Sequence, residues 1–243
     1  MEKSTQEPVE ATAMETVGSV VAKDFRTAEV LEKYGIDFCC GGNMPLAQAC
    51  REKGIDLEAL RRELEEVAAR PQERSQNYGA WELPFLADYI VNEHHSYLKE
   101  NIPTIAAYAT KIAQVHGANH PEVVQIAQIF EKVAADMTQH LKSEEEQLFP
   151  AIRKLTELRK SGVAPDAEEM KRLKAVLAEL GHEHDEVGAA VHEIRRLAKN
   201  YTVPGDVCNT FMVTYQKLKE FEDDLHKHVH LENNILFLKA AKL

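Results

Sequence analysis

Four long segments of the chain carry apolar residues at the three- and four-residue spacing of a helix that buries one face. Short breaks rich in glycine, proline and polar residues separate the segments. Long helices with such short connections are typical of an all-α, up-down-up-down four-helix bundle. The helical segments are expected at about residues 82–115, 121–158, 166–199 and 206–240.

The first third of the chain has a different pattern, with short helical segments that stop at glycines. Asp24 and Asp56 can each cap the start of a helix, and Gly35 and Gly54 can each end one. A polar stretch then separates this small helical region from the bundle. The predicted organisation is a disordered tail, an N-terminal helical domain, a linker and the bundle, at residues 1–13, 14–70, 71–80 and 81–243.

Inside the predicted bundle, histidine and glutamate interrupt otherwise apolar stripes. Buried ionisable groups are costly unless they are paired or bind a metal. In two antiparallel helices, residues lie at one level when the midpoint of their numbers falls in the connecting turn. For each neighbouring pair of helices this midpoint falls in or just past the break, so all four helices contribute to one layer, within about a 5.4 Å turn. The residues of this predicted layer are His95, His140, Glu144, His184, His228 and Glu232.

The composition of this layer indicates a metal centre. His-x-x-x-Glu occurs twice, at 140–144 and 228–232, and the spacing puts both side chains of each pair on one face. Four imidazoles with two carboxylates suit two first-row ions that share the carboxylates as bridges, and this donor set suits iron. The prediction is therefore two non-haem iron ions with carboxylate and oxo bridges. A single iron or zinc ion stays open as an alternative. Glu145, one position off the stripe, is expected to play no part.

The remaining histidines are separated by their phase on the helices. Both His94 and His95 fit between the apolar positions on either side, but the stripe continues from His95 to Ile102. His95 is therefore the preferred residue of this helix. His226 and His230 lie two positions from the stripe and are expected to be solvated.

The paired cysteines Cys39 and Cys40 lie in a glycine-flanked loop between a helix stop and a helix start. A helix N-terminus lowers the pKa of a thiol and favours the reactive thiolate. A redox pair, or a pair that handles iron or a nitrosyl group, is favoured over two small buried residues. Cys50 and Cys208 lie within helical patterns and are expected to be structural.

Composition excludes several classes of protein. Hydrophobic residues make up 44% of the chain, and charged residues make up 28% with a formal net charge of −11. This balance argues against nucleic acid or an anionic membrane as a partner, because both require a basic surface. The N-terminus lacks a signal-peptide pattern, and no apolar stretch approaches the roughly 20 residues of a membrane span. A cytoplasmic location is expected.

Four motifs together resemble the RIC (repair of iron centres) proteins of the ScdA/YtfE type. They are Asp-Phe-Cys-Cys-Gly-Gly at 37–42, His-x-x-x-Glu with Leu-Phe-Pro at 140–150, Glu-His-Asp-Glu at 183–186 and His-x-x-Leu-Glu-Asn-Asn at 228–234. The resemblance runs from about residue 16 to the end of the chain. It implies a hemerythrin-like di-iron bundle with four terminal histidines and two bridging glutamates. It also implies a first-helix ligand eight residues before a proline, which here is His95.

The function that this resemblance implies is the restoration of iron–sulfur clusters damaged by nitric oxide or oxidants, by donation of iron. The expected partners are damaged or apo iron–sulfur proteins, with nitric oxide and dioxygen as small ligands of the di-iron site, and a homodimer is also expected. Two alternatives stay open, namely a di-iron nitric oxide or peroxide reductase and a sensor or carrier of these gases. Turnover would favour the enzyme, and reversible binding would favour the sensor.

Overall fold

The computed structural model describes residues 15–69 and 77–243 of the 243-residue chain. These residues belong to two compact units, Met1–Asn77 and Tyr78–Leu243. The tail predicted at 1–13 and most of the linker predicted at 71–80 lie outside the described residues.

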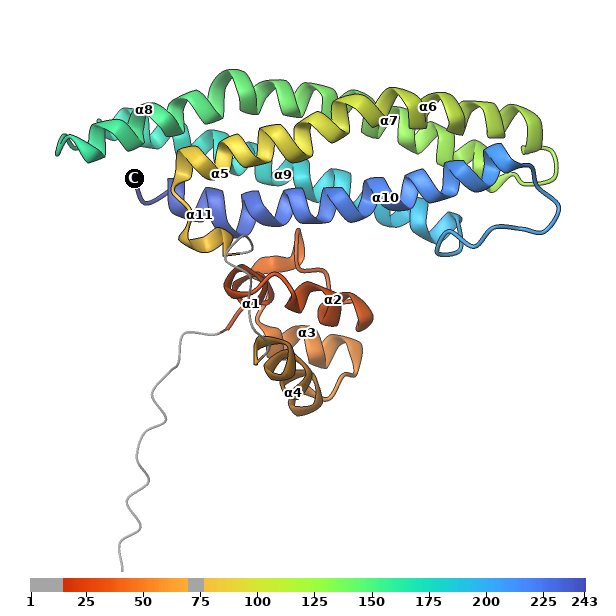
Figure 1. The fold of residues 1–243 in the computed structure, drawn as a ribbon, viewed down its shortest axis with the longest axis horizontal. Coiled ribbons are helices and arrows are strands. Elements are labelled where there is room, and N and C mark those ends of the chain that lie inside the picture. The colour runs from red at the N-terminus through yellow and green to blue at the C-terminus, as the bar shows by residue number, and fades with distance from the viewer. Residues whose placement is uncertain (1–14, 70–76) are drawn as a thin grey trace, which may run out of the picture. The chain divides into compact units, whose positions relative to one another are not determined.

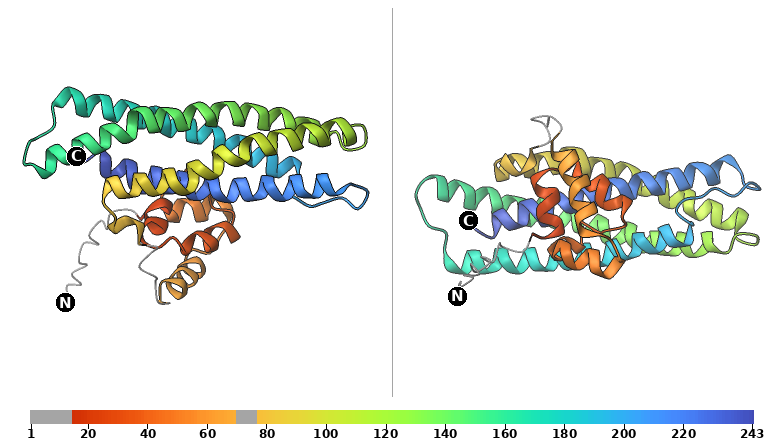
Figure 2. Two further views of the ribbon diagram at one scale, coloured as in Figure 1. Left: turned by 45° about the horizontal axis from the view of Figure 1, so that its top comes forward. Right: turned by 90° about the horizontal axis from the view of Figure 1, so that it is seen from below.

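The second unit is an all-α bundle of four rods that alternate in direction (Figures 1 and 2), which confirms the predicted fold class. The rods meet along their lengths through contacts of α6 with α7, α7 with α9 and α10 with α6. The first rod consists of α5 (Leu83–Ile90), η4 (Val91–His95) and α6 (Ser96–His116). The second rod consists of α7 (Glu122–Ser143), η5 (Glu144–Leu148) and α8 (Phe149–Lys160). The third rod is the single helix α9 (Ala167–Leu197). The fourth rod consists of α10 (Asn209–Leu231), η6 (Glu232–Leu236) and α11 (Phe237–Ala240).

Apolar side chains at helical spacing hold the rods together. On α7 the predicted stripe is buried, from Val123 through Phe130 to Met137. Facing stripes on α9 and α10 are buried in the same way, with Phe130 packed edge-on against Phe221 at 5.2 Å between ring centroids. Asp166 begins α9 by accepting a hydrogen bond from the backbone of Glu168. The stripe pattern of the sequence therefore corresponds to the core of the bundle.

Three of the four rods contain one turn of π-helix, and the sequence analysis did not predict any of them. These turns are η4, η5 and η6, which interrupt regular α-helix on both sides. A π-turn is rare and occurs frequently at functional sites. His95 is the last residue of η4, whereas Glu144 and Glu232 are the first residues of η5 and η6. Each π-turn therefore includes a residue of the predicted metal layer.

The first unit is formed by short helices, as the sequence predicts. Thr16 begins the first helix with a capping box, and Asp56 caps the last by accepting from the backbone of Glu58. Gly54 ends the third helix with a positive φ of 66°, a conformation that glycine adopts without strain. The elements are α1 (Val17–Lys23), α2 (Thr27–Lys33), η1 (Gly41–Asn43), α3 (Leu46–Lys53) and α4 (Leu57–Ala68). Within the described residues, no helix is both long enough and apolar enough to cross a bilayer.

Candidate metal centre

The six residues predicted from the stripes and turns meet in one buried layer of the bundle. Each has at most 3% of its surface exposed. Their donor atoms form two groups of four, each group with all atoms within 4.8 Å of one another. The two groups share both glutamates. The first group is His95, Glu144, His228 and Glu232, and the second is His140, Glu144, His184 and Glu232.

Distances within the layer show how the shared glutamates lie between the histidines. In the first group, His95 Nε2 is 3.3 Å from Glu144 Oε2, and His228 Nε2 is 3.0 Å from Glu232 Oε1. The other oxygen of Glu232, Oε2, lies 3.2 Å from His184 Nε2 in the second group. Glu232 therefore presents one oxygen to each group, which is the arrangement that a bridging carboxylate requires.

The other glutamate also lies between the two groups, but with a single oxygen. His140 Nε2 lies 3.4 Å from Glu144 Oε2, the oxygen that also faces the first group. The Nε2 atoms of His140 and His184 lie only 3.0 Å apart, so both rings point at one place. Two imidazole nitrogens and two carboxylate oxygens converge in each group, which suits a first-row metal ion.

Hydrogen bonding gives an independent test of whether the layer fits metal ions. In the described part of the chain, seven buried atoms of the layer residues have no hydrogen-bond partner, namely His95 Nε2, both ring nitrogens of His228 and both carboxylate oxygens of Glu144 and Glu232. An unsatisfied buried polar atom costs about 1–3 kcal/mol, and more when it is charged. Coordination to cations would satisfy all of these atoms except His228 Nδ1. The residues therefore fit a metal site.

Burial also sets the charge of the donors. It lowers the pKa of His228 to about 4, and burial with the neighbouring His184 lowers the pKa of His140 to about 4, so both rings offer a lone pair at neutral pH. Burial and the nearby Glu232 carboxylate raise the pKa of Glu144 to about 8. Although burial disfavours protonation of His95, its contacts with the two glutamates raise its pKa to about 10. A bound cation would compete with these protons, because ligands coordinate in their deprotonated form.

A second set of side chains holds the rings in place, and the sequence analysis missed it. Glu145 Oε1 lies 2.8 Å from His95 Nδ1, so this residue, which the sequence analysis left without a part, contacts a ring of the layer. Its carboxylate also accepts from Lys99 at 2.6 Å. A hydrogen bond to Nδ1 fixes the ring orientation and leaves Nε2 directed at the metal. Phase on the stripe could not reveal this role, because Glu145 contacts the outer side of the ring.

Two further rings are oriented from Nδ1 in the same way. Glu183 Oε2 lies 2.7 Å from His140 Nδ1, and Asn233 Oδ1 lies 2.9 Å from His184 Nδ1. Glu183 precedes one layer residue in the sequence and Asn233 follows another. A polar residue beside a predicted ligand is thus the one signal that could have identified these partners.

Of the histidines outside the layer, His94 agrees with the prediction, whereas His226 and His230 do not. His94 is buried, and its Nδ1 pairs with Asp224 Oδ1 at 2.8 Å, so it contributes no donor atom to either group. His226 and His230 were expected to be solvated, but they are 7% and 0% exposed. The reason is that the C-terminal part of α10 is buried on more than one face.

The cysteine pair lies next to an acidic side chain. Asp37 Oδ1 accepts from the backbone amides of Cys39 and Cys40 at 2.9 and 3.1 Å, and the two sulfurs are 3.7 Å apart. The hydrogen bond to Cys40 and burial raise the pKa of Cys39 well above its ordinary value. The predicted lowering of the pKa is therefore wrong for Cys39. The following helix, η1, is only three residues long and offers little dipole to offset the carboxylate.

The other two cysteines differ from each other. Cys50 is buried in α3, in agreement with a structural role. Cys208 is exposed at the N-cap of α10 and not within a helix, so the same expectation is wrong for it. Its sulfur lies 3.1 Å from His116 Nε2, and this hydrogen bond lowers the pKa of Cys208 to about 7.

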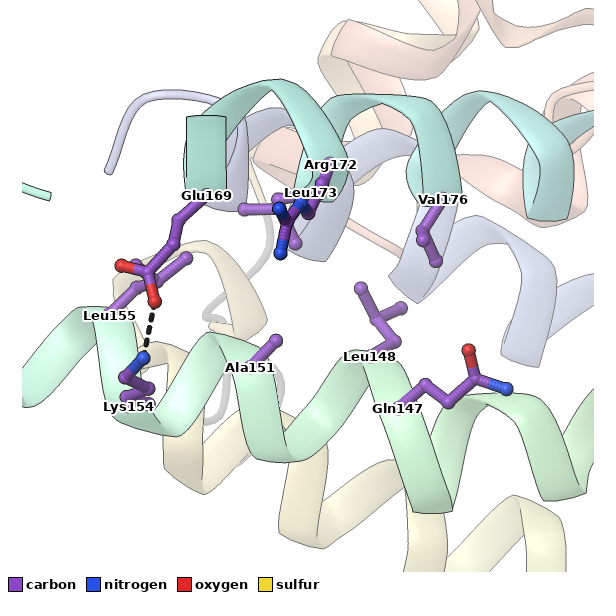
Figure 3. A pocket seen from close by; sticks show the side chains of 9 residues that line it. All are labelled: Gln147, Leu148, Ala151, Lys154, Leu155, Glu169, Arg172, Leu173 and Val176. Carbon is purple, nitrogen blue, oxygen red and sulfur yellow. Dashed lines mark hydrogen bonds and ion pairs between the residues drawn. The ribbon is translucent and has the colours of Figure 1, made fainter. Parts of the chain in front are cut away.

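The surface of the bundle has two hollows near the layer of six residues, and only one of them is lined by a layer residue. One lies between α7 and α9 and is lined by His140, Glu183 and Val187 among others, so it reaches a residue of the layer. Figure 3 shows the other, between α8 and α9, where Lys154 and Glu169 form an ion pair across the opening. None of the six layer residues lines that second hollow. Of these two hollows, only the one between α7 and α9 is lined by a layer residue.

Comparison with known proteins assigns both parts of the chain. The profile of the hemerythrin HHE cation binding domain matches residues 86–240, and that of ScdA_N, a domain of unknown function, matches residues 13–68. The iron–sulfur cluster repair protein ScdA of Staphylococcus haemolyticus is 32% identical over 225 residues, covering 93% of this chain and 97% of that protein. The iron–sulfur cluster repair proteins YtfE of Citrobacter koseri and Yersinia pestis are 32% and 28% identical, covering 88% and 94% of this chain and 91% and 97% of their own lengths.

Proposed function

Because the chain belongs to the family of iron–sulfur cluster repair proteins that includes ScdA and YtfE, we propose that it takes part in repairing damaged iron–sulfur clusters. The observation that carries this proposal is the buried layer of four imidazoles and two shared carboxylates. Both the matched cation binding domain and the donor groups of the layer support a function that depends on a bound cation.

The cation that we propose is iron, two ions per chain. His95 and His228 would hold one ion, His140 and His184 the other, and Glu144 with Glu232 would bridge them. Imidazole and carboxylate donors suit iron, and the layer contains no thiolate that would favour a structural zinc site. Two protein imidazoles per ion leave positions open for a small molecule.

The protein's own residues then define what the centre can do. Asn233 and the outer carboxylates Glu145 and Glu183 fix the rings, so the donor atoms are held in position before a metal arrives. We propose that a small ligand approaches the centre from the hollow that His140 lines. Bound iron would supply a binding place for nitric oxide or dioxygen and a source of metal for a damaged cluster.

For the first unit we propose a separate role. The domains proposed from the sequence, 14–70 and 81–243, assign the cysteine pair and the metal layer to different parts of the chain. Cys39 and Cys40 would accept iron or a nitrosyl group during repair. Their short separation of 3.7 Å between sulfurs and the adjacent Asp37 carboxylate support a cation-accepting pair. The raised pKa of Cys39 keeps that thiol protonated until a metal displaces the proton.

The experiment that tests repair uses an apo iron–sulfur acceptor. Anaerobically purified wild type, Glu144→Ala and the double variant Cys39→Ser/Cys40→Ser are compared for iron content and for iron appearing in the acceptor. We expect about two irons per chain in the wild type and the cysteine variant, and restoration of the cluster by the wild type alone. A single bound metal would refute the di-iron centre. Equal restoration by the cysteine variant would refute the role of the pair.

A second candidate function is a reductase or sensor of nitric oxide or dioxygen, which the hollow reaching His140 favours. Consumption of nitric oxide with an added electron donor distinguishes the reductase, and reversible spectral change without consumption distinguishes the sensor. We further propose a cytoplasmic location and a homodimer, which cell fractionation and analytical ultracentrifugation would test.

A further inference from the structure

A second cluster of potential metal donors lies in the bundle outside the layer. His192 on α9 and Glu222 and His226 on α10 have donor atoms that all lie within 4.8 Å of one another. Glu222 and His226 are four residues apart and share one face of α10. Glu222 and His226 are buried, whereas His192 is exposed.

Glu222 shows which part of this cluster is already occupied. Its Oε2 accepts hydrogen bonds from Arg195 Nε at 2.9 Å and from the Tyr201 hydroxyl at 2.7 Å. Its Oε1 accepts none from the described residues, although the side chain is fully buried. That oxygen faces His226 Nε2 at 3.9 Å, a separation too long for a hydrogen bond.

An ion pair that ties α9 to α10 would explain Oε2 but not Oε1. A buried carboxylate oxygen without a donor is costly, and neither imidazole donates a hydrogen bond to Glu222 Oε1. The rings of His192 and His226 lie 5.7 Å apart at 63°, so they do not stack face to face. One cation between the rings and Oε1 would be coordinated by all three groups.

We propose that His192, Glu222 and His226 form a mononuclear site for a divalent first-row cation, separate from the layer of six residues. Two imidazoles and one carboxylate are a donor set that binds Fe²⁺ and its neighbours and leaves positions open. His192 lies eight residues beyond His184 on the same helix, a rise of roughly 12 Å. That separation greatly exceeds a coordination bond of about 2 Å, so the two places hold different ions.

The combination of an exposed histidine with a buried glutamate suits an ion that exchanges with solvent. If the chain donates iron, as we propose above, this site binds Fe²⁺ transiently as the ion enters or leaves the bundle. That use rests on the proposed function, whereas the binding of a cation at His192 does not. The experiment therefore measures the two sites separately in one sample.

The test is an anaerobic equilibrium dialysis of the iron-loaded full chain against Co²⁺. Iron and cobalt per chain are measured together, and the visible cobalt absorption reports coordination. The variants are His192→Ala and Glu222→Gln, and the matched control is His182→Ala, which removes another exposed histidine of α9. Circular dichroism of each protein checks the helical content.

We expect the wild type and the control to bind one more cobalt per chain than His192→Ala. The loss corresponds to at least about a tenfold weaker affinity, since removing a mere outer-shell contact already costs about 10–100-fold. Glu222→Gln should lose the same cobalt while its iron content stays unchanged. Undiminished cobalt binding by His192→Ala, or no cobalt beyond the layer in the wild type, would overturn this proposal. Loss of one cobalt in His192→Ala from a chain without iron in the layer would support this site and refute the di-iron proposal.

Discussion

Glu145→Ala should weaken metal binding, although Glu145 contributes no donor atom to the layer. The carboxylate lies 2.8 Å from His95 Nδ1, and the substitution removes the group that orients this ring. Loss of an outer partner of a metal-bound histidine typically costs about 10–100-fold in affinity. This range corresponds to about 1.4–2.7 kcal/mol at the ion that His95 would hold. The accompanying loss of the Lys99 ion pair adds little, because the Lys99 side chain is 53% exposed.

The assay is competition for iron with a chromophoric chelator under anaerobic conditions. Glu146→Ala is the matched control, because it removes the same charge from the next residue, which is exposed. We expect one of the two ions to be lost at lower chelator concentration in Glu145→Ala and both to be retained in the control. Identical titrations of the two variants would show that ring orientation does not depend on Glu145.

Three other outcomes follow from the described geometry. His95→Ala should lose iron whereas His94→Ala should keep it, because His94 pairs with an aspartate outside the layer; equal iron content would reassign the ligand. Alkylation of Cys208, followed by mass spectrometry, should rise with pH through a midpoint near 7, where an unperturbed thiol is only a few per cent thiolate. His116→Ala should move this midpoint upward, and an unchanged midpoint would remove His116 as the cause. A fragment spanning 78–243 should bind as much iron as the full chain by metal analysis, since every layer residue lies within it.

Sequence alone predicted the bundle and the residues that meet in its layer, because both depend on periodicity and on turn positions. A histidine that interrupts an apolar stripe is visible in one dimension, and turn positions give the height of each residue. The contacts of Glu145 and Glu183 were not predictable in this way, because they are made across the rods and from the outer side of a ring. The pKa of Cys39 was predicted in the wrong direction for a similar reason. The loop position suggested a helix dipole, whereas the hydrogen bond to Cys40 and burial dominate, and the Asp37 carboxylate adds to them.

The π-turns also explain why both His94 and His95 fit between the apolar positions on either side of them. A turn with one additional residue shifts the apolar stripe by one position, so both neighbours connect the stripe before η4 to the stripe after it. Such a turn has a consequence for how a metal centre of this kind can be lost. Deleting the layer residue itself from such a turn restores a regular helix and leaves the flanking stripes in register, while one donor of the layer is removed. A bundle of this type could therefore lose its metal centre through a single-codon deletion and still keep its fold.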